Sequence, residues 1–90
     1  MKHFKAMITI TLRKSILDVQ GKTVEHALHS TNFTSIDQVR IGKYVELTVH
    51  AADTQQAMSI VDDACKNIIA NPIMEDHHIA LEEISVGEHA

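Results

Sequence analysis

The feature that most constrains this chain is a strict alternation of apolar and other side chains near its beginning. From Phe4 to Leu12 every second residue is apolar, and the positions between carry Lys, Met or Thr. A period of two held over this length predicts a β-strand that extends to Arg13. Its regularity indicates a central strand, with one face packed on helices and the other carrying Met7 and two threonines.

A helix should follow, beginning at Val19. Asp18 has the position of an N-cap, because its carboxylate can accept hydrogen bonds from the amides of Gln20 and Gly21 and its charge suits the positive end of the helix. Gly21 falls in the first turn, where glycine costs roughly 1 kcal/mol relative to alanine. We expect a closely approaching backbone segment to offset that cost. The helix should pack on the strand through an apolar stripe formed by Val24, Ala27 and Leu28.

The middle of the chain has the pattern of a β-hairpin. Alternation resumes over Ile36 to Ile41 and continues over Tyr44 to His50, with two residues between the runs. If Ile41 and Val45 are to lie on one face, the connection needs an odd-length loop or a bulge. Gly42 can adopt the unusual backbone angles that either solution requires.

A second helix and a last strand complete the pattern. Asp53 is the expected N-cap, and Gln56 three residues later gives a capping-box arrangement. The helix should end before Pro72, which has no amide to continue it. His77 to Ile84 then predicts a fourth strand, and the tail over 85–90 should fray. The apolar stripe of this helix comprises Ala57, Ile60, Val61, Ala64 and Ile68.

The element order is therefore β-α-β-β-α-β within a single domain, residues 1–90. Its usual arrangement is a four-stranded antiparallel sheet with both helices on one face, the ferredoxin-like or split-βαβ fold of the α+β class. The other face would be bare, with Arg40 and Glu46 as a cross-strand charge pair. We expect a second copy to cover it and give a homo-oligomer, either a dimer or a tetramer. The bare face comprises Met7, Thr9, Thr11, Arg40, Tyr44, Glu46, Thr48 and His50.

Composition excludes several classes of partner. A formal net charge of −4 argues against a nucleic-acid-binding protein, which needs a basic face. With no Trp, one Tyr and two Phe, the chain also lacks a base-stacking platform. One cysteine cannot form an internal disulfide, and no apolar run approaches the roughly 20 residues that span a bilayer. We therefore expect a cytoplasmic protein that binds neither nucleic acid nor membrane.

Seven histidines would suggest a metal site if they clustered. His26 and His29 lie one helical turn apart on a solvated face, but no Cys or carboxylate is placed unambiguously to complete a tetrahedron. His77 and His78 point to opposite sides of a strand and cannot chelate one ion together. The sequence therefore predicts no metal and no cofactor.

The sequence also predicts no catalytic group. Cys65 lies on the shoulder of the second helix's buried stripe, where a cysteine usually acts as a small apolar residue. Glu82 and Glu83 are neighbours on a strand and face opposite ways, so they are solvated charges rather than a catalytic pair. The three glycines are isolated and cannot form a phosphate cradle.

Three segments do resemble one known family in their order and spacing: Leu17 to Lys22, Val39 to Leu47 and Ala70 to Asp76. They resemble the small, PurS-type subunit of phosphoribosylformylglycinamidine synthase of bacterial purine biosynthesis, over nearly the whole chain. Each segment alone is a weak signal, but three in sequence within a β-α-β-β-α-β chain are fairly specific.

The resemblance implies a subunit without catalytic groups that joins a glutaminase subunit to an ATP-dependent synthetase subunit. Ammonia released from glutamine would then reach formylglycinamide ribonucleotide. The sequence departs from the family pattern after Asp76, where His77 and His78 replace an aromatic and a charged residue, and where Ala80 replaces a more polar one. The candidate partner contacts are Asp18, Gln20, Gly21, Lys22, Arg40, Gly42, Lys43 and Asn71.

Two other classes of function stay open at this point. The first is a small-molecule-binding regulatory module of similar topology, which would bind an effector between paired domains. Such modules are usually fused to the enzyme that they regulate, so a free chain of 90 residues favours the subunit. The second is a structural dimer without a partner.

Overall fold

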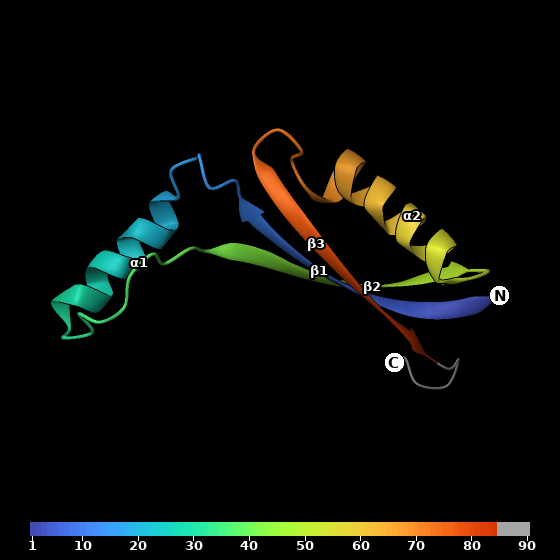
Figure 1. The fold of residues 1–90 in the computed structure, drawn as a ribbon, viewed down its shortest axis with the longest axis horizontal. Helices are drawn as coiled ribbons and strands as arrows, with labels where there is room; N and C mark the ends of the chain where they lie inside the picture. The colour runs from blue at the N-terminus through green and yellow to red at the C-terminus, as the bar shows by residue number, and fades with distance from the viewer. Residues whose placement is uncertain (85–90) are drawn as a thin grey trace.

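A computed structural model describes residues 1–84, so the expected frayed tail over 85–90 lies outside the described residues. Figure 1 shows the first helix at one end of the molecule and the second helix over the sheet at the other. The α+β class is as predicted. The elements in chain order are β1 (Lys2–Leu12), α1 (Val19–Ser30), β2 (Gly42–Ala51), α2 (Thr54–Ala64), a π-helical turn η1 (Cys65–Ile69) and β3 (Glu75–Ile84).

Strand β1 is the centre of the sheet, as its alternation predicted. The strand order is β2-β1-β3, and both neighbours pair with β1 in antiparallel fashion. The register places Ile8 opposite Val45 on one side and opposite Ile79 on the other. Because alternate residues of a strand share a face, the apolar positions of all three strands gather on the same side of the sheet.

The hydrophobic core lies between this side of the sheet and α2. Phe4, Ile8 and Ile10 are each no more than 1% exposed, and they contribute most of the buried volume of β1. Around them pack the partly buried side chains of the two outer strands, as the sequence predicted: Val45, Leu47, Ile79 and Leu81.

Helix α2 has the N-terminus that the sequence predicted. Asp53 Oδ1 accepts a hydrogen bond from the Gln56 amide at 2.8 Å, and Gln56 Oε1 accepts one from the Ala52 amide at 2.6 Å. The first bond satisfies an amide of the first turn that has no intrahelical partner, and the second ties the helix to the residue before its N-cap. The helical path ends with η1. One residue, Ala70, separates η1 from Asn71 and Pro72.

The buried side of α2 differs in part from the predicted stripe. Ala57 and Val61 are buried as expected, but Ile60 is 44% exposed and Ile68 is 85% exposed. Cys65 lies fully within the core, so it serves as a small apolar side chain. The π-helical turn has more residues per turn than an α-helix, and this change of phase directs Ile68 to solvent.

The expected strand over 36–41 does not form, and the sheet of the described residues has three strands rather than four. Strand β2 begins only at Gly42 and runs beside β1 to Ala51, with Gly42 opposite Thr11. The predicted hairpin is therefore wrong, and Gly42 has no positive φ angle. Glycine is needed there for another reason, because a Cβ would lie 2.4 Å from the Ile10 carbonyl oxygen.

Residues 33–41, which we call the return segment, run back along α1 and are held by the helix's side chains. His29 Nε2 lies 2.6 Å from the Ile36 carbonyl oxygen, and Glu25 Oε1 accepts a hydrogen bond from the Val39 amide at 3.0 Å. The alternation that predicted a strand is present, but the backbone groups that a neighbouring strand would satisfy are satisfied by α1 instead.

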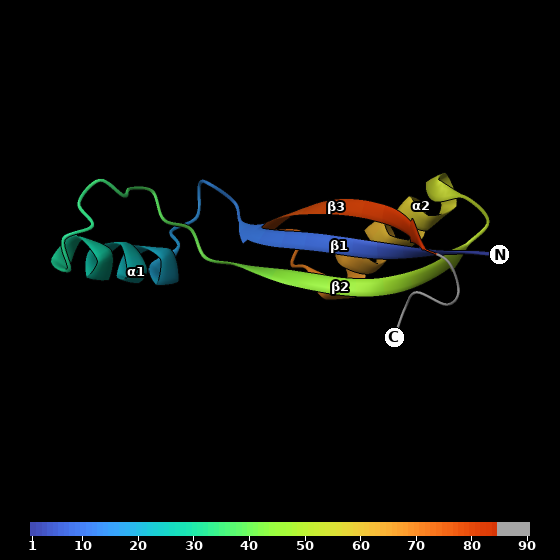
Figure 2. The ribbon, with the colours of Figure 1, turned by 90° about the horizontal axis from the view of Figure 1, so that it is seen from below.

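Helix α1 does not pack on the sheet, contrary to the prediction. With the return segment it forms an arm, residues 14–41, that projects beyond the end of the sheet (Figures 1 and 2). The molecule measures 52 × 29 × 17 Å, and its radius of gyration is 16.8 Å. A compact domain of this length would have a radius of gyration of about 12 Å. Val24 and Ala27 of the predicted stripe are consequently exposed.

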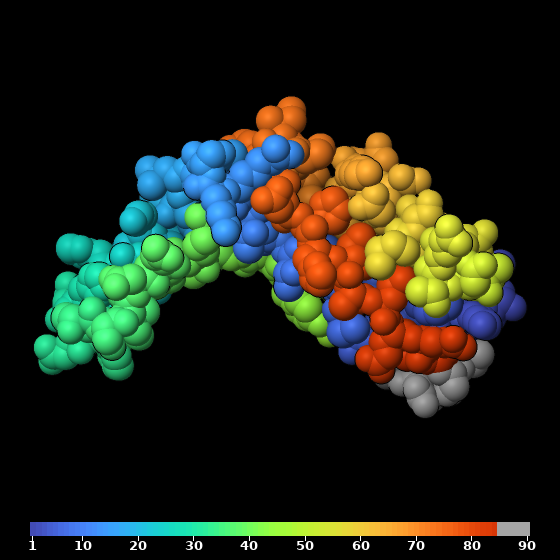
Figure 3. Space-filling model, viewed as in Figure 1, coloured from blue at the N-terminus to red at the C-terminus, as the bar shows by residue number. Residues whose placement is uncertain are grey.

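No helix within residues 1–84 covers the second face of the sheet, as predicted, and α2 lies on the opposite side. Figure 3 shows the molecule as an arch, with α2 on its convex side and α1 at one foot. Tyr44 is 56% exposed on the bare face and Met7 is half-buried. Arg40 does not belong to this face, because the return segment lies outside the sheet.

Gly21 marks the closest approach between α1 and the return segment. It is the one residue of α1 that is buried, and a Cβ built on it would lie 2.3 Å from the Val39 carbonyl oxygen. The approaching backbone that the sequence led us to expect is therefore the return segment.

Replacing Gly21 tests this contact. Gly21→Ala should lower the free energy of unfolding by about 1–3 kcal/mol because the new methyl group overpacks the junction, although alanine is the better helix former. Urea denaturation followed by circular dichroism measures the change, with His26→Ala on the exposed side of α1 as the control. An unchanged or raised midpoint would show that the two backbones are not in contact.

Candidate functional site

The carboxylate of Asp18 joins the arm to the sheet. Its Oδ1 accepts a hydrogen bond from the Gly21 amide at 2.9 Å, and its Oδ2 accepts one from the Ile41 amide at 2.7 Å. The first bond is the predicted N-cap, whereas no sequence pattern indicated the second. Asp18 is 7% exposed and is the one buried acidic or basic side chain among residues 1–84. A single side chain thus starts α1 and fixes the end of the return segment.

These contacts lower the pKa of the Asp18 carboxyl below its usual value. The hydrogen bond from the Gly21 amide is the largest cause, and the bond from the Ile41 amide is the next in the same direction. Desolvation opposes the shift, and the charge of Arg40 adds a smaller lowering effect. Because all three of these partners favour the ionised form, the carboxylate is charged at neutral pH.

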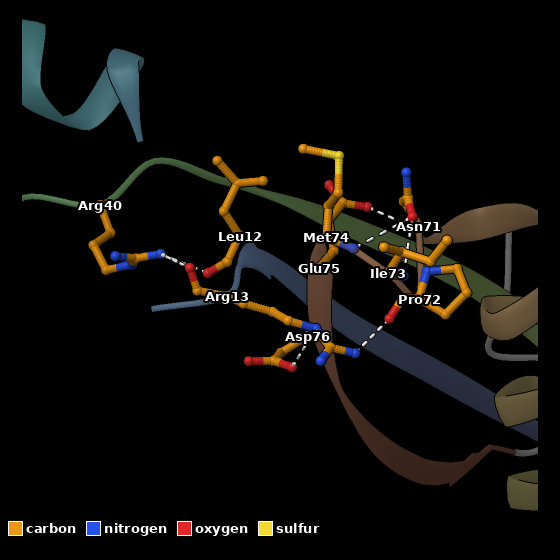
Figure 4. Close-up of polar contacts among 9 residues, drawn as sticks. All are labelled: Leu12, Arg13, Arg40, Asn71, Pro72, Ile73, Met74, Glu75 and Asp76. Atoms are coloured by element: carbon orange, nitrogen blue, oxygen red, sulfur yellow. Dashed lines mark hydrogen bonds and ion pairs between the residues drawn. The ribbon is translucent and has the colours of Figure 1, made fainter. Parts of the chain in front are cut away.

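Arg40 ties the return segment to the end of β1. Its Nη2 donates to the Leu12 carbonyl oxygen at 2.5 Å and to the Arg13 carbonyl oxygen at 3.2 Å (Figure 4). The predicted pair between Arg40 and Glu46 is therefore wrong. Glu46 instead accepts a hydrogen bond from the Tyr44 hydroxyl at 2.8 Å on the bare face.

The turn over 71–74, which precedes β3, lies at the other side of β1, and Asn71 organises it. The side-chain oxygen Oδ1 of Asn71 accepts a hydrogen bond from the Ile73 backbone amide at 3.0 Å. The backbone amide of Asn71 donates to Glu75 Oε1 at 2.8 Å. The second oxygen of Glu75 lies 3.5 Å from Lys43 Nζ, so the same carboxylate reaches the start of β2. Asn71 and Lys43 are thus linked through a residue that the sequence analysis did not name.

Arg13 is the other residue that the sequence analysis missed. Its amide donates to the Met74 carbonyl oxygen at 2.9 Å, and its guanidinium donates to the Pro72 carbonyl oxygen (Figure 4). Its Nε also lies 3.8 Å from Asp76 Oδ1. In the sequence Arg13 only ends an alternating run, and Pro72 lies 59 residues away. No local pattern could have paired them.

The candidate contacts therefore lie on three segments that meet where β1 ends: residues 18–22, 40–43 and 71. We call this region the arm root. A groove of about 470 Å³ lies between the loop after β1, the start of α1 and the return segment. Three cationic side chains line it, together with Asp18 and Glu25: Lys14, Lys22 and Arg40. A smaller groove of about 150 Å³ is lined in part by Gln20, Gly42 and Lys43.

The histidines of β3 point to opposite faces, as predicted. His77 Nε2 lies 2.8 Å from Asp62 Oδ1 on α2, whereas His78 is exposed on the bare face. The contact with His77 is the largest cause of a lowered pKa at Asp62, followed by the contact with Lys66. His77 therefore docks α2 on β3. None of the helices described here has the length and apolar character to cross a membrane.

Residues 5–83 match the model of a protein family described as PurS: phosphoribosylformylglycinamidine (FGAM) synthase. The chain belongs to the PurS family. Among similar proteins, the PurS subunit of phosphoribosylformylglycinamidine synthase from Bacillus subtilis is 38% identical over 81 residues, which cover 90% of this chain and 95% of that protein. The resemblance carried by three short segments is confirmed over most of the chain.

Solved structures give the same family. PurS of Methanocaldococcus jannaschii, one of the subunits of formylglycinamide ribonucleotide amidotransferase in the purine biosynthetic pathway, is 28% identical with a TM-score of 0.82. That match covers 91% of this chain and 99% of the other. A chain in the structure of PurLQS from Thermotoga maritima is 30% identical with a TM-score of 0.81, covering 93% and 100% respectively.

Asp18→Asn should separate the helix cap from the bond to Ile41. Asparagine caps helices about as well as aspartate, so its oxygen can still accept from the Gly21 amide. Its side-chain amide group, however, would present a donor to the Ile41 amide, which is also a donor. We expect a less stable arm at neutral pH, measured by urea denaturation followed by circular dichroism.

The effect of this substitution should depend on pH. Because the folded-state pKa of Asp18 is lowered, its charge stabilises the fold above the unfolded-state pKa of about 3.9, and that stabilisation is lost as the pH falls through the folded-state pKa. The stability difference between the wild type and Asp18→Asn should be largest at neutral pH and shrink in acid. Asp63→Asn, on the exposed side of α2, is the control. A difference that stays constant with pH would argue against a role for the charge.

Proposed function

We propose that this PurS chain holds a glutaminase subunit and an ATP-dependent synthetase subunit of phosphoribosylformylglycinamidine synthase in one cytoplasmic assembly. The observation that carries the proposal is the match, over nearly the whole chain, to a chain of PurLQS from Thermotoga maritima. In this role the chain supplies contacts, and the partner subunits supply the catalytic groups.

Such a subunit acts by positioning. Ammonia released from glutamine is diluted in solvent and is largely protonated at neutral pH, so its delivery to formylglycinamide ribonucleotide depends on holding two active sites together. An elongated chain suits this task, because its 52 Å length separates the arm from the covered end of the sheet (Figure 1). Two partners can then bind to different parts of one small protein.

The arm root is the surface that we propose for partner binding. Gln20 and Lys22 are exposed on the first turn of α1, and Leu17 and Val19 beside them are 67% and 65% exposed. Exposed apolar side chains that lie beside exposed polar ones are typical of a protein interface. Asp18 and Gly21 fix the position of that turn, and Arg40 holds the return segment at the end of β1. The remaining candidates, Gly42, Lys43 and Asn71, lie at the start of β2 and in the turn before β3.

Reconstitution of the complex tests the function. Synthetase, glutaminase and this chain are mixed, and ADP formation is followed with glutamine or with ammonium as the nitrogen source. Omission of the chain should abolish glutamine-dependent turnover, while high ammonium should still sustain the synthetase in part. Full glutamine-dependent activity without the chain would overturn the proposal.

Surface variants of the same chain locate the contact. Gln20→Ala and Lys22→Ala should weaken assembly and raise the concentration of this chain needed for half-maximal glutamine-dependent activity. His26→Ala, exposed further along α1, is the matched control. Arg40→Ala and Lys43→Ala should also weaken assembly, but Arg40→Ala needs a stability measurement beside it because it removes the bonds to the end of β1.

The bare face of the sheet is the surface that we propose for a homodimer. A small domain with one covered sheet face gains much from further burial, and this face carries Met7, Ala80 and Tyr44. Met7→Lys should produce monomers in sedimentation velocity at micromolar concentration. Met58→Lys is the matched control, because Met58 is 37% exposed on α2. A wild type that is monomeric, or a Met7→Lys variant that stays dimeric, would exclude this face as the interface.

The regulatory module is the second candidate function, and the groove at the arm root is the observation that favours it. Its volume of about 470 Å³ is within the range of small-molecule sites. The cations Lys14, Lys22 and Arg40 in its lining suit an anionic effector. Calorimetry with nucleotides and amino acids distinguishes the two functions, because saturable binding by the free chain is expected only of the regulatory module.

A further inference from the structure

The arm contains a group of three potential metal ligands, of which only Glu25 also lines the groove at the arm root. Glu25 and His29 lie one turn apart on α1, and Asp37 lies opposite them on the return segment. One ligand atom from each of the three residues lies within 4.8 Å of the others. The sequence led us to expect no metal because Asp37 is brought to His29 only by the path of the return segment.

The spacing of His29 and Asp37 is that of two ligands of a tetrahedral ion. His29 Nε2 and Asp37 Oδ1 are 3.4 Å apart. Two ligands at the usual distances of about 2.0–2.1 Å from a tetrahedral zinc ion are themselves about 3.4 Å apart. Glu25 Oε1 accepts a hydrogen bond from the Val39 amide at 3.0 Å, which orients the carboxylate and leaves lone pairs for an ion.

The charge of the group also favours a cation. Two carboxylates and a neutral imidazole carry two negative charges, in a chain whose formal net charge is −4. The side chain of His29 is 36% exposed and that of Asp37 is 70% exposed, so an ion can enter from solvent. An imidazole among the ligands favours zinc over magnesium or calcium, which prefer oxygen ligands alone.

We propose that Glu25, His29 and Asp37 bind one Zn²⁺ ion, with water as the fourth ligand. Without metal, His29 Nε2 interacts with the Ile36 carbonyl oxygen at 2.6 Å. Zinc binds the neutral tautomer whose single proton is on Nδ1, so the proton that Nε2 shares with the Ile36 carbonyl oxygen moves to Nδ1 by exchange with water when the ion binds. Bound zinc joins the outer part of α1 to the return segment, about three helical turns from Asp18.

Calorimetric titration of the chelator-treated full chain with ZnCl₂ at neutral pH tests the proposal. We expect one saturable site per chain. His29→Gln and Asp37→Asn should each weaken zinc binding at least tenfold, and His26→Gln, on the exposed side of the same helix, should leave it unchanged. Circular dichroism without metal establishes that each variant is folded, and Asp37→Asn removes the most exposed of the three ligands.

The site of binding has its own readout. Hydrogen exchange measured residue by residue should show that zinc slows exchange of the Val39 amide in the wild type and not in Asp37→Asn, because the ion holds Glu25 in place. Zinc affinity that is unchanged in His29→Gln would place the ion at other histidines and overturn the proposal. Absence of saturable zinc binding would also overturn the proposal. His29 and Asp37 would then form only a side-chain pair, with the carboxylate of Glu25 beside it.

Discussion

The position of the arm depends on one carboxylate that accepts two backbone amides from different segments. Asp18 receives the Gly21 amide at the start of α1 and the Ile41 amide at the end of the return segment. These bonds lie next to Gly42, with which β2 begins. The outgoing and returning parts of the arm therefore meet at one side chain. Because the carboxylate is nearly buried, losing either amide would leave an oxygen poorly satisfied.

The sheet is organised by β1 in a comparable way. Both neighbouring strands pair with β1, and one face of the sheet is closed by α2. Since α1 projects away, the bare face and the apolar residues of the arm depend on other molecules for burial. Phe33, at the start of the return segment, is 53% exposed. This distribution fits a chain whose stability and function are completed by assembly.

The sequence was informative wherever a pattern was long or a cap was local. The ten-residue alternation of β1, the Asp18 cap and the reciprocal capping of α2 all came from neighbours in the chain. The strand over 36–41 failed because alternation indicates an extended backbone without identifying its partner, and here the partner is a helix. The contact between Arg13 and the turn over 71–74 depends on the antiparallel register of two distant strands. At the candidate site, a sequence pattern indicated the cap at Asp18 but not the contacts of Arg13 and Glu75, which join segments far apart in the chain.

The arm's stability differs in kind from that of the sheet. Gly21 is the one buried residue of α1, and a helix of 12 residues is marginal in water without tertiary packing. The arm is held by a row of contacts to the return segment from the N-cap Asp18 and from Glu25 and His29 of α1. Such a row can open without disturbing the core of the sheet, because no core residue belongs to the arm. Partners that cover the apolar residues of the arm would therefore stabilise its geometry as they bind, which couples the order of the arm to assembly.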